Sequence, residues 1–196
     1  MVKINNKQTP LNTDQQILTA TLKLFSEKGY FNTSVRDISR ESGVSIGSIY
    51  HHFKDKEGVA SAIYNSLLER INSELSEIQS VHKTAHDRCH AVVSFLFELT
   101  EQEPDVMEFM LYSKHREFLP DEIPLCSSQP FELMREMVKS GMQSGEIETM
   151  DVILASSCLY GAALRMITSK LDGLLEKPLY EYLDTIWKHS WKSVCI

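Results

Sequence analysis

The sequence lacks the features that mark secreted, disulfide-bonded and membrane-spanning proteins. It has only four cysteines among its 196 residues, and they lie far apart and include no Cys-x-x-Cys pair. This usage favours reduced thiols over a disulfide framework. No stretch approaches the ~18 consecutive apolar residues that suggest a membrane span, and the first ten residues lack the apolar segment of a signal peptide. We therefore expect a cytoplasmic protein without a membrane span.

Strand patterns and the sequence motifs of common enzyme classes are also missing. No alternating apolar run is bounded by hairpin turns, and there is no internal repeat. There is no phosphate-binding loop, no dinucleotide-binding glycine pattern, no nucleophile elbow and no credible pair of catalytic carboxylates. We expect an all-α fold, no enzyme activity and no cofactor.

Charge is distributed unevenly along the chain. The net charge is −7, which by itself argues against a nucleic-acid partner. Residues 1–58, however, hold eight Lys or Arg and six Asp or Glu, whereas residues 59–196 hold twelve and twenty-one. A mildly basic N-terminal segment followed by an acidic remainder fits a protein that contacts DNA at one end and repels it elsewhere.

Two short helices joined by a glycine turn are predicted within residues 33–56. Thr33 is expected to cap the first of them, Gly43 to make the turn, and Ser45 to cap the second. A longer helix capped by Thr13 precedes them. This is the helix-turn-helix pattern, in which the second short helix enters the major groove of DNA.

Residues 14–64 resemble the DNA-binding domain of the TetR family of bacterial transcription regulators. The resemblance is carried by the segments 27–30 (EKGY), 33–38 (TSVRDI), 42–45 (SGVS), 47–50 (GSIY), 52–53 (HF) and 56–57 (KE). It implies an all-α fold of about nine helices, with an N-terminal three-helix helix-turn-helix domain and a C-terminal helical ligand-binding and dimerisation domain. In the C-terminal part the sequence shows only the family's general layout.

The resemblance also assigns DNA-contacting residues. One group would meet backbone phosphates: Thr33, Ser34, Arg36, Tyr50, His52, Lys54 and Lys56. A second group at the start of the third helix would line the groove, because small side chains let a helix approach base edges: Ser45, Ile46, Gly47, Ser48 and His51. For Tyr50 or His52 taken singly, a packed or solvated role is as good an interpretation.

We divide the chain into three parts: a flexible arm at 1–12, a helix-turn-helix domain at 13–58 that continues into a fourth helix, and a ligand-sensing and dimerisation domain at 59–196. Within the arm, Lys3 and Lys7 have the character of residues that reach into an adjacent minor groove. A frayed terminus is the more common alternative.

The last two expected helices, about 151–172 and 178–194, have the character of a dimer seam. The first carries small residues that permit close approach, and the second carries an apolar stripe, so that two helices from each subunit would form a four-helix bundle. The expected interface residues are Ala155, Gly161, Ala162, Leu183, Ile186, Trp187 and Trp191. The alternative is that they close only the core of one subunit.

Seven of the eight methionines follow residue 100. Methionine adapts to irregular apolar ligands, so an apolar pocket is expected among these helices, with Arg or His available for an acidic head group. The candidates are Met107, Met110, His115, Phe118, Met134, Met137, Tyr160 and Arg165. Ordinary helical core is the alternative for each residue taken singly.

His82, His86 and His90 recur every four residues, a spacing that can hold a metal ion on a helix. No fourth ligand is evident, so we assign no metal site and expect a solvated or pocket-edge histidine face, with a metal at His86 and His90 left open.

These features together predict a dimeric repressor that binds a palindromic operator as a homodimer and is released by a small apolar or amphipathic effector. The alternatives are an activator of the same family and a helical protein-interaction module without DNA binding.

Overall fold

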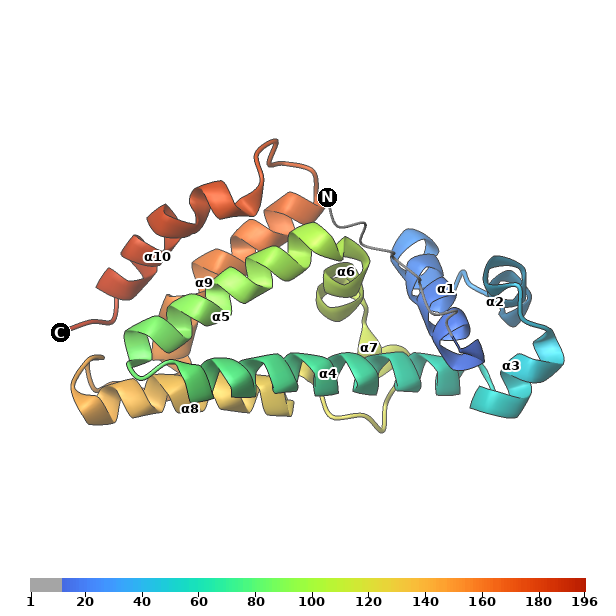
Figure 1. The fold of residues 1–196 in the computed structure, drawn as a ribbon, viewed down its shortest axis with the longest axis horizontal. Helices are drawn as coiled ribbons and strands as arrows, with labels where there is room; N and C mark the ends of the chain where they lie inside the picture. The colour runs from blue at the N-terminus through green and yellow to red at the C-terminus, as the bar shows by residue number, and fades with distance from the viewer. Residues whose placement is uncertain (1–11) are drawn as a thin grey trace, which may run out of the picture. The chain divides into compact units, whose positions relative to one another are not determined.

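The computed structural model describes residues 12–196, which form ten α-helices and two short 3-10 helices with no β-strand in that range (Figure 1). The predicted all-α fold is confirmed. The predicted arm, with Lys3 and Lys7, lies outside the described residues except for Asn12.

Contacts divide the chain into two compact units, one that ends at Ile63 and one that begins at Tyr64. The boundary falls inside α4 (Lys56–Val81), a continuous helix of 26 residues. It lies a few residues beyond position 58, because the first turns of α4 bury Val59 and Ile63 in the first unit.

The N-terminal unit consists of α1 (Thr13–Lys28), α2 (Val35–Ser42), α3 (Ile46–Phe53) and the first turns of α4. The apolar residues of α1 recur at helical spacing and pack against α2, which in turn contacts α3. This core buries Ile17, Leu24, Phe25, Ile38 and Ile49 to 3% exposure or less. Its function is to hold two very short helices in a fixed geometry.

The caps of α1 and α2 lie one residue away from the predicted ones. Asn12, not Thr13, caps α1, and its Oδ1 accepts a hydrogen bond from the Gln15 N–H at 2.8 Å. Ser34, not Thr33, caps α2. The reason is that the Thr33 hydroxyl is buried and donates to the Gly29 carbonyl at 2.9 Å, so it is not available to a helix end. Ser45 caps α3 as expected.

In the C-terminal unit, α5 (Ala85–Gln102) contacts α6 (Pro104–Tyr112), α8 (Gln129–Ser144), α9 (Val152–Leu171) and α10 (Leu183–Lys192). The largest side chains of this core include Phe97, Phe109, Met137, Leu159 and Ile167, all less than 2% exposed. Helices α5 and α8 approach closely because Gly141 has no side chain: a Cβ there would lie 2.7 Å from the Ala85 Cβ.

Two expected helices are interrupted. From Pro104, a residue suited to the first turn of a helix, we expect one helix to about Leu119. The segment is instead divided into α6 and α7 (His115–Phe118), because Ser113 adopts an extended backbone and turns the His115 ring toward Tyr64 and Phe109 at centroid distances of 4.8 and 4.9 Å. The last helix begins as a 3-10 turn, η2 (Leu179–Tyr182), before α10. A second 3-10 turn, η1 (Leu125–Ser127), precedes α8.

By length and composition alone, α9 could cross a membrane: its mean hydropathy is 1.4 over the most apolar window. A third of that window is buried, and α9 packs against α5, α8 and α10. The core helix of a bundle meets the same criterion. The rest of the helix therefore leaves apolar surface that the single chain does not cover.

Candidate DNA-binding surface and regulatory sites

The start of α3 is an open polar surface. Ser45 accepts a hydrogen bond from the Ser48 N–H at 3.2 Å, which fixes the first turn. Next to it, Gly47 has no atom within 4 Å of the position its Cβ would take, and Ile46 is 37% exposed. A helix end with small side chains and no covering atoms can come close to base edges.

Further along α3, larger side chains project into solvent. Tyr50 is 50% exposed, and His51 and His52 are also exposed. His51 and His52 pack edge to face at 5.5 Å, and His52 Nδ1 lies against the Asp14 carboxylate on α1. Among the described residues, Tyr50 and His51 form no side-chain hydrogen bond, so their polar groups are available to an external partner.

The beginning of α2 contributes a second polar patch. Ser34 and Asp37 form a reciprocal capping box, and the Arg40 guanidinium binds the Asp37 carboxylate at 2.6 Å. Hydrogen bonds from Ser34 to Asp37 hold the pKa of that carboxyl below its usual range. Arg36 is exposed and forms no ion pair within the described part of the chain, so its charge is free to face a phosphate.

Lys54 has a strained backbone. Its φ of 68° makes it the only residue other than glycine with positive φ among those described. The Asp55 N–H donates to the Phe53 carbonyl at 2.8 Å across it, which closes a three-residue turn at the end of α3. For a residue that carries a side chain, positive φ costs about 1 kcal/mol of conformational energy. The turn leaves the Lys54 side chain exposed.

Two residues that were predicted to contact DNA phosphates, Thr33 and Lys56, instead donate hydrogen bonds to main-chain carbonyls within the N-terminal unit. Thr33 is 2% exposed, and its hydroxyl donates to main-chain carbonyls of α1 and the following turn. The Lys56 ammonium donates to the carbonyls of Tyr30 and Thr33, both at 2.8 Å, and lies 4.0 Å from the centre of the Tyr30 ring. Burial lowers the Lys56 pKa. Both residues thus position the turn before α2.

The predicted pocket residues do not form one group. Met107, Met110, Phe118, Met134, Met137 and Tyr160 are buried, whereas Arg165 is exposed and bonds Thr168 on its own helix. Met134 and Tyr160 line a cavity between α8 and α9 that has a volume of about 290 Å³. Most of the others are core, which is the alternative that the sequence left open.

The cavity between α8 and α9 is mostly apolar, with a cation at its edge. Phe131 and Leu164 line it beside Met134, and Arg135 is the single charged residue of the lining. The Arg135 guanidinium donates to the Cys126 carbonyl at 3.0 Å, which holds it at the cavity. Sequence reasoning missed Arg135, although a lone arginine within an apolar helical stripe was a usable signal.

His115 is the predicted pocket residue with the most unusual environment. Its ring lies among the aromatic rings of Tyr64, Phe109 and Phe118, and its Nε2 is buried without a hydrogen-bond partner among the described residues. Burial lowers the His115 pKa to about 4, so the ring is neutral at neutral pH. It cannot serve there as a charged partner for an acidic head group.

The expected dimer residues separate into two sets. Ala155 is fully buried and Trp187 is 7% exposed, so both pack inside the subunit. In contrast, Ala162 is exposed on α9, together with Leu154 at 55% and Cys158, which the sequence reading did not include. Gly161, Leu183, Ile186 and Trp191 are half-buried. The uncovered face is therefore on α9.

The histidines of α5 belong to an aromatic cluster. The Trp187 indole N–H donates to His86 Nε2 at 3.0 Å, while His86 Nδ1 faces the Asp87 carboxylate at 3.0 Å. Trp187 also stacks on Trp191 at 5.5 Å. Both ring nitrogens of His86 are thus engaged by protein groups. Within residues 12–196, no group of three or more His, Cys, Asp or Glu side chains is placed to hold a metal ion.

Comparison with known proteins agrees with this architecture. Residues 17–63 match the family described as bacterial regulatory proteins, tetR family. The chain is 27% identical over 158 residues to the fatty acid metabolism regulator protein of Bacillus subtilis (strain 168), which covers 79% of this chain and 81% of that protein. It is 36% identical over 81 residues to the HTH-type transcriptional regulator HbdR of Aromatoleum sp. (strain CIB), which covers 41% of this chain but only 35% of that protein.

The similarity to known proteins also covers the fold of the C-terminal unit. The crystal structure of the transcriptional regulator FadR from Bacillus subtilis, in complex with stearoyl-CoA, matches with a TM-score of 0.76 at 21% identity and covers 89% of this chain and 96% of that one. The family match covers residues 17–63, and the fold of the whole chain is that of TetR-family transcription regulators of known structure.

Proposed function

We propose that the chain is a cytoplasmic repressor that binds a palindromic operator as a homodimer and releases it when a small amphipathic effector binds. The observation that carries the DNA-binding part is the exposed face of α3, on which Tyr50 and His51 form no side-chain hydrogen bond among the described residues. Such a face has no role in the fold of the domain, and its size and composition suit the major groove.

Within this surface, the residues have different roles. Ile46, Gly47, Ser48 and His51 face the bases, while Tyr50, Lys54 and Arg36 contact backbone phosphates. Ser34 and Ser45 present main-chain N–H groups of helix ends, which favour an anion. His52 supports the surface through Asp14. Thr33 and Lys56 act only by holding the turn before α2.

We place the dimer contact on the exposed face of α9, around Leu154, Cys158 and Ala162. This face is apolar and follows one side of the helix, which explains why α9 is more apolar than its burial within one subunit requires. A twofold dimer presents two copies of α3, and half-sites in such operators lie about 34–36 Å apart or multiples of that distance.

The effector proposal rests on the cavity between α8 and α9. Its apolar walls and the single Arg135 at its edge suit a molecule with an apolar chain and an anionic group. The Bacillus subtilis regulator crystallised with stearoyl-CoA, a molecule of this type, which supports the same chemical class here. Release of DNA requires that the effector prefer the conformation with low operator affinity, because equal affinity for both shifts nothing.

Fluorescence anisotropy with the DNA upstream of the protein's own gene tests both parts. Binding should be tighter than to scrambled DNA of equal length and should weaken as salt is raised. If the protein binds both DNAs weakly and equally, the next experiment is a selection of bound fragments from genomic DNA. Failure to enrich any sequence in that selection would contradict the DNA-binding proposal and favour a protein-interaction module.

The effector is tested on the same complex with stearoyl-CoA, and with CoA as the control that lacks the acyl chain. We expect stearoyl-CoA to lower operator affinity and CoA to leave it unchanged. Unchanged affinity across a series of acyl-CoA chain lengths would overturn the effector while leaving DNA binding intact. Tighter binding in the presence of acyl-CoA, or increased transcription from the operator, would identify an activator or a corepressed regulator instead.

A further inference from the structure

The His52 side chain on α3 is held on one side by α1. Its Nδ1 faces the carboxylate of Asp14, and the Asp14 Oδ1 atom at this contact is buried. The His52 side chain nevertheless remains 32% exposed. Among the described residues, no hydrogen bond engages its Nε2. One ring nitrogen is therefore occupied by the protein, and the other is available to an external partner.

The Asp14 carboxylate decides which nitrogen of the His52 ring carries a hydrogen. An ionised carboxylate accepts hydrogen bonds and donates none, so the Nδ1 that faces it must be the protonated nitrogen. In the neutral ring, Nε2 then holds a lone pair and acts as an acceptor. Donation from Nε2 requires a second proton, which converts the ring to an imidazolium.

The position of His52 along α3 places it at the edge of the proposed groove contact. His52 follows Ser48 by four residues, so the two side chains lie on the same side of the helix. Because Ser48 faces the bases in the proposed complex, a longer side chain one turn later reaches the DNA backbone that borders the groove. Phosphate oxygens are anionic and only accept hydrogen bonds. A neutral His52 would present a lone pair to them, whereas the imidazolium donates to Asp14 and to a phosphate at once.

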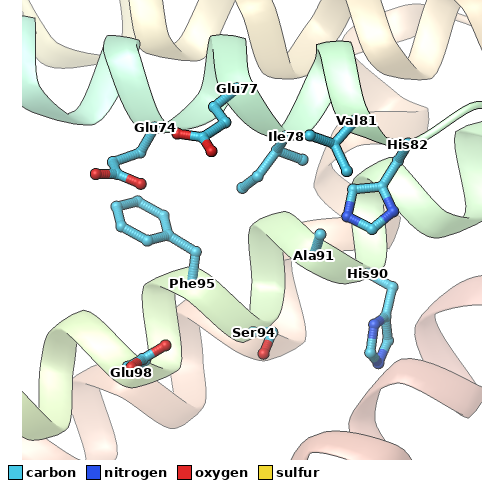
Figure 2. A pocket seen from close by; sticks show the side chains of 10 residues that line it. All are labelled: Glu74, Glu77, Ile78, Val81, His82, His90, Ala91, Ser94, Phe95 and Glu98. Atoms are coloured by element: carbon cyan, nitrogen blue, oxygen red, sulfur yellow. The ribbon is translucent and has the colours of Figure 1, made fainter.

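The other titratable groups differ from this pair in their surroundings. Among the described residues, the titratable groups against the His52 ring are Asp14 on α1 and His51 on α3, whose ring lies edge to face at 5.5 Å. The five remaining histidines belong to the C-terminal unit. Figure 2 shows two of them, His82 and His90, at a groove between α4 and α5, where burial lowers the His90 pKa. They lie outside the proposed DNA-binding surface.

We propose that His52 binds a DNA phosphate as an imidazolium, so that operator binding takes up a proton from the solvent at His52 Nε2. Asp14 is a positioning residue: it fixes Nδ1 as the nitrogen that faces the protein and Nε2 as the one that faces DNA. The imidazolium also separates the Asp14 carboxylate from the phosphate, two groups that otherwise repel each other. This inference rests on the proposed DNA binding by α3 and makes that binding dependent on pH.

The direction of the pH dependence follows from the charge of the bound ring. The complex favours the protonated form, so operator affinity is high at low pH and falls as the pH rises through the range in which histidine side chains lose their charge. Each operator binds two subunits. We therefore expect an uptake of about one proton per dimer near pH 7, and an affinity about tenfold lower at about pH 8 than at about pH 6.5.

Calorimetric titration of the full chain with duplex DNA measures the proton uptake directly. The DNA is the fragment upstream of the protein's own gene, or the genomic fragment enriched by selection, and the titration is run near pH 7 in PIPES and in Tris. The two buffers release a proton with different ionisation enthalpies, so the difference between the two heats gives the number of protons taken up. Sequence-selective binding with equal heats in both buffers and an affinity that does not change with pH would overturn the inference and leave the proposed DNA binding intact. Absence of selective binding would overturn both.

Two variants assign the proton to this pair. In His52→Gln an amide N–H donates to the phosphate without a proton from the solvent, so the uptake should be lost and the affinity should change less than about twofold over the same pH range. In Asp14→Asn the neutral ring is free to carry its hydrogen on Nε2, so the uptake should fall at least about twofold, while the affinity at about pH 8 equals or exceeds that of the wild type. Uptake that persists in His52→Gln would place the proton on another group, such as His51, and would overturn the inference. A lower affinity of Asp14→Asn at both pH values with unchanged uptake would give Asp14 a purely structural role.

Two further variants are matched controls. Glu27→Gln removes an equal charge from an exposed position on α1, and His189→Gln removes an exposed histidine from the C-terminal unit. Both should keep the proton uptake and the pH dependence of the wild type. Loss of uptake in Glu27→Gln would mean that the overall charge of the domain, and not the contact between Asp14 and His52, sets the proton link. Circular dichroism and thermal melting establish that each variant is folded.

Discussion

The two units differ in how they use polar groups. In the N-terminal unit, Ser34 bonds to Asp37 and Ser45 to the Ser48 N–H, both three residues away, while Lys56 reaches back to the turn before α2. In the C-terminal unit, His115 Nε2 and Asn72 Oδ1 are buried without partners among the described residues, and cavities remain between the helices. The first unit is a scaffold for a surface, and its one buried side-chain atom without a hydrogen bond among the described residues, Asp14 Oδ1, lies against His52 Nδ1. The second unit has space and unpaired polar atoms for a ligand.

The largest effect is expected where the subunits meet. Leu154→Arg combined with Ala162→Arg places two charges on the exposed face of α9 and should convert the dimer to a monomer, measured by light scattering after size-exclusion chromatography. Operator affinity should fall about a hundredfold because each head then holds its half-site alone. Ile123→Arg, at a 61% exposed position in a loop, is the control. A double variant that remains dimeric would exclude α9 as the interface.

Acid should destabilise the C-terminal unit through His115. The unfolded chain takes up a proton near pH 6.5, whereas the folded His115 resists protonation until about pH 4. Its neutral form therefore stabilises the fold fully above about pH 6.5, and this contribution is lost as pH falls toward 4.

Because the ring is partly accessible to solvent, which screens its charge, we expect a loss of about 2 kcal/mol. His115→Phe should reduce that loss in urea unfolding at low pH, whereas exposed His189→Phe should not. An unchanged acid dependence in His115→Phe would show that another group controls it.

DNA binding should depend on Tyr50 without a matching change in stability. Tyr50→Ala removes a half-exposed ring and a hydroxyl that has no internal partner, so operator affinity should fall about tenfold while the melting temperature stays nearly constant. Tyr180→Ala, at a 69% exposed position in the other unit, should leave affinity unchanged. A fall in melting temperature that accounts for the lost binding would assign Tyr50 to packing instead.

The smallest effects should separate two neighbouring lysines. Lys54→Gly relieves the positive φ and should raise the free energy of unfolding by about 1 kcal/mol, while the dependence of log affinity on log salt falls by about one unit per half-site. Lys56→Met should lower the free energy of unfolding by about 1–2 kcal/mol through the lost bonds to Tyr30 and Thr33, with little change in salt dependence. The opposite pattern of results would assign the phosphate contact to Lys56 and the structural role to Lys54.

Local signals predicted most of the N-terminal unit. The Gly43 turn and the Ser45 cap are consequences of backbone geometry and short-range hydrogen bonds, so neighbouring residues suffice to identify them. The errors arose where a distant contact decided between similar residues. Thr33 and Ser34 are equally good caps by type, and only the burial of Thr33 against α1 selects Ser34.

In the C-terminal unit, the enrichment in methionine indicated an apolar interior but not the position of a cavity within it. Met107 and Met137 are core, whereas Met134 and Tyr160 line a cavity together with Arg135, which was not among the predicted residues. Likewise, Trp187 of the apolar stripe on the last helix is buried inside the subunit, where its indole N–H donates to His86 across a separation of 101 residues, while Leu183, Ile186 and Trp191 are half-buried.

Neighbouring residues alone indicate the helical fold, the resemblance to the TetR family and the place of the helix proposed to enter the major groove, because periodicity, caps and turns depend on residues a few positions apart. Packing decides which lysine faces solvent, which face of α9 stays uncovered and where the cavity beside Arg135 lies. These properties depend on which helices meet, and packing between residues distant in the chain fixes that.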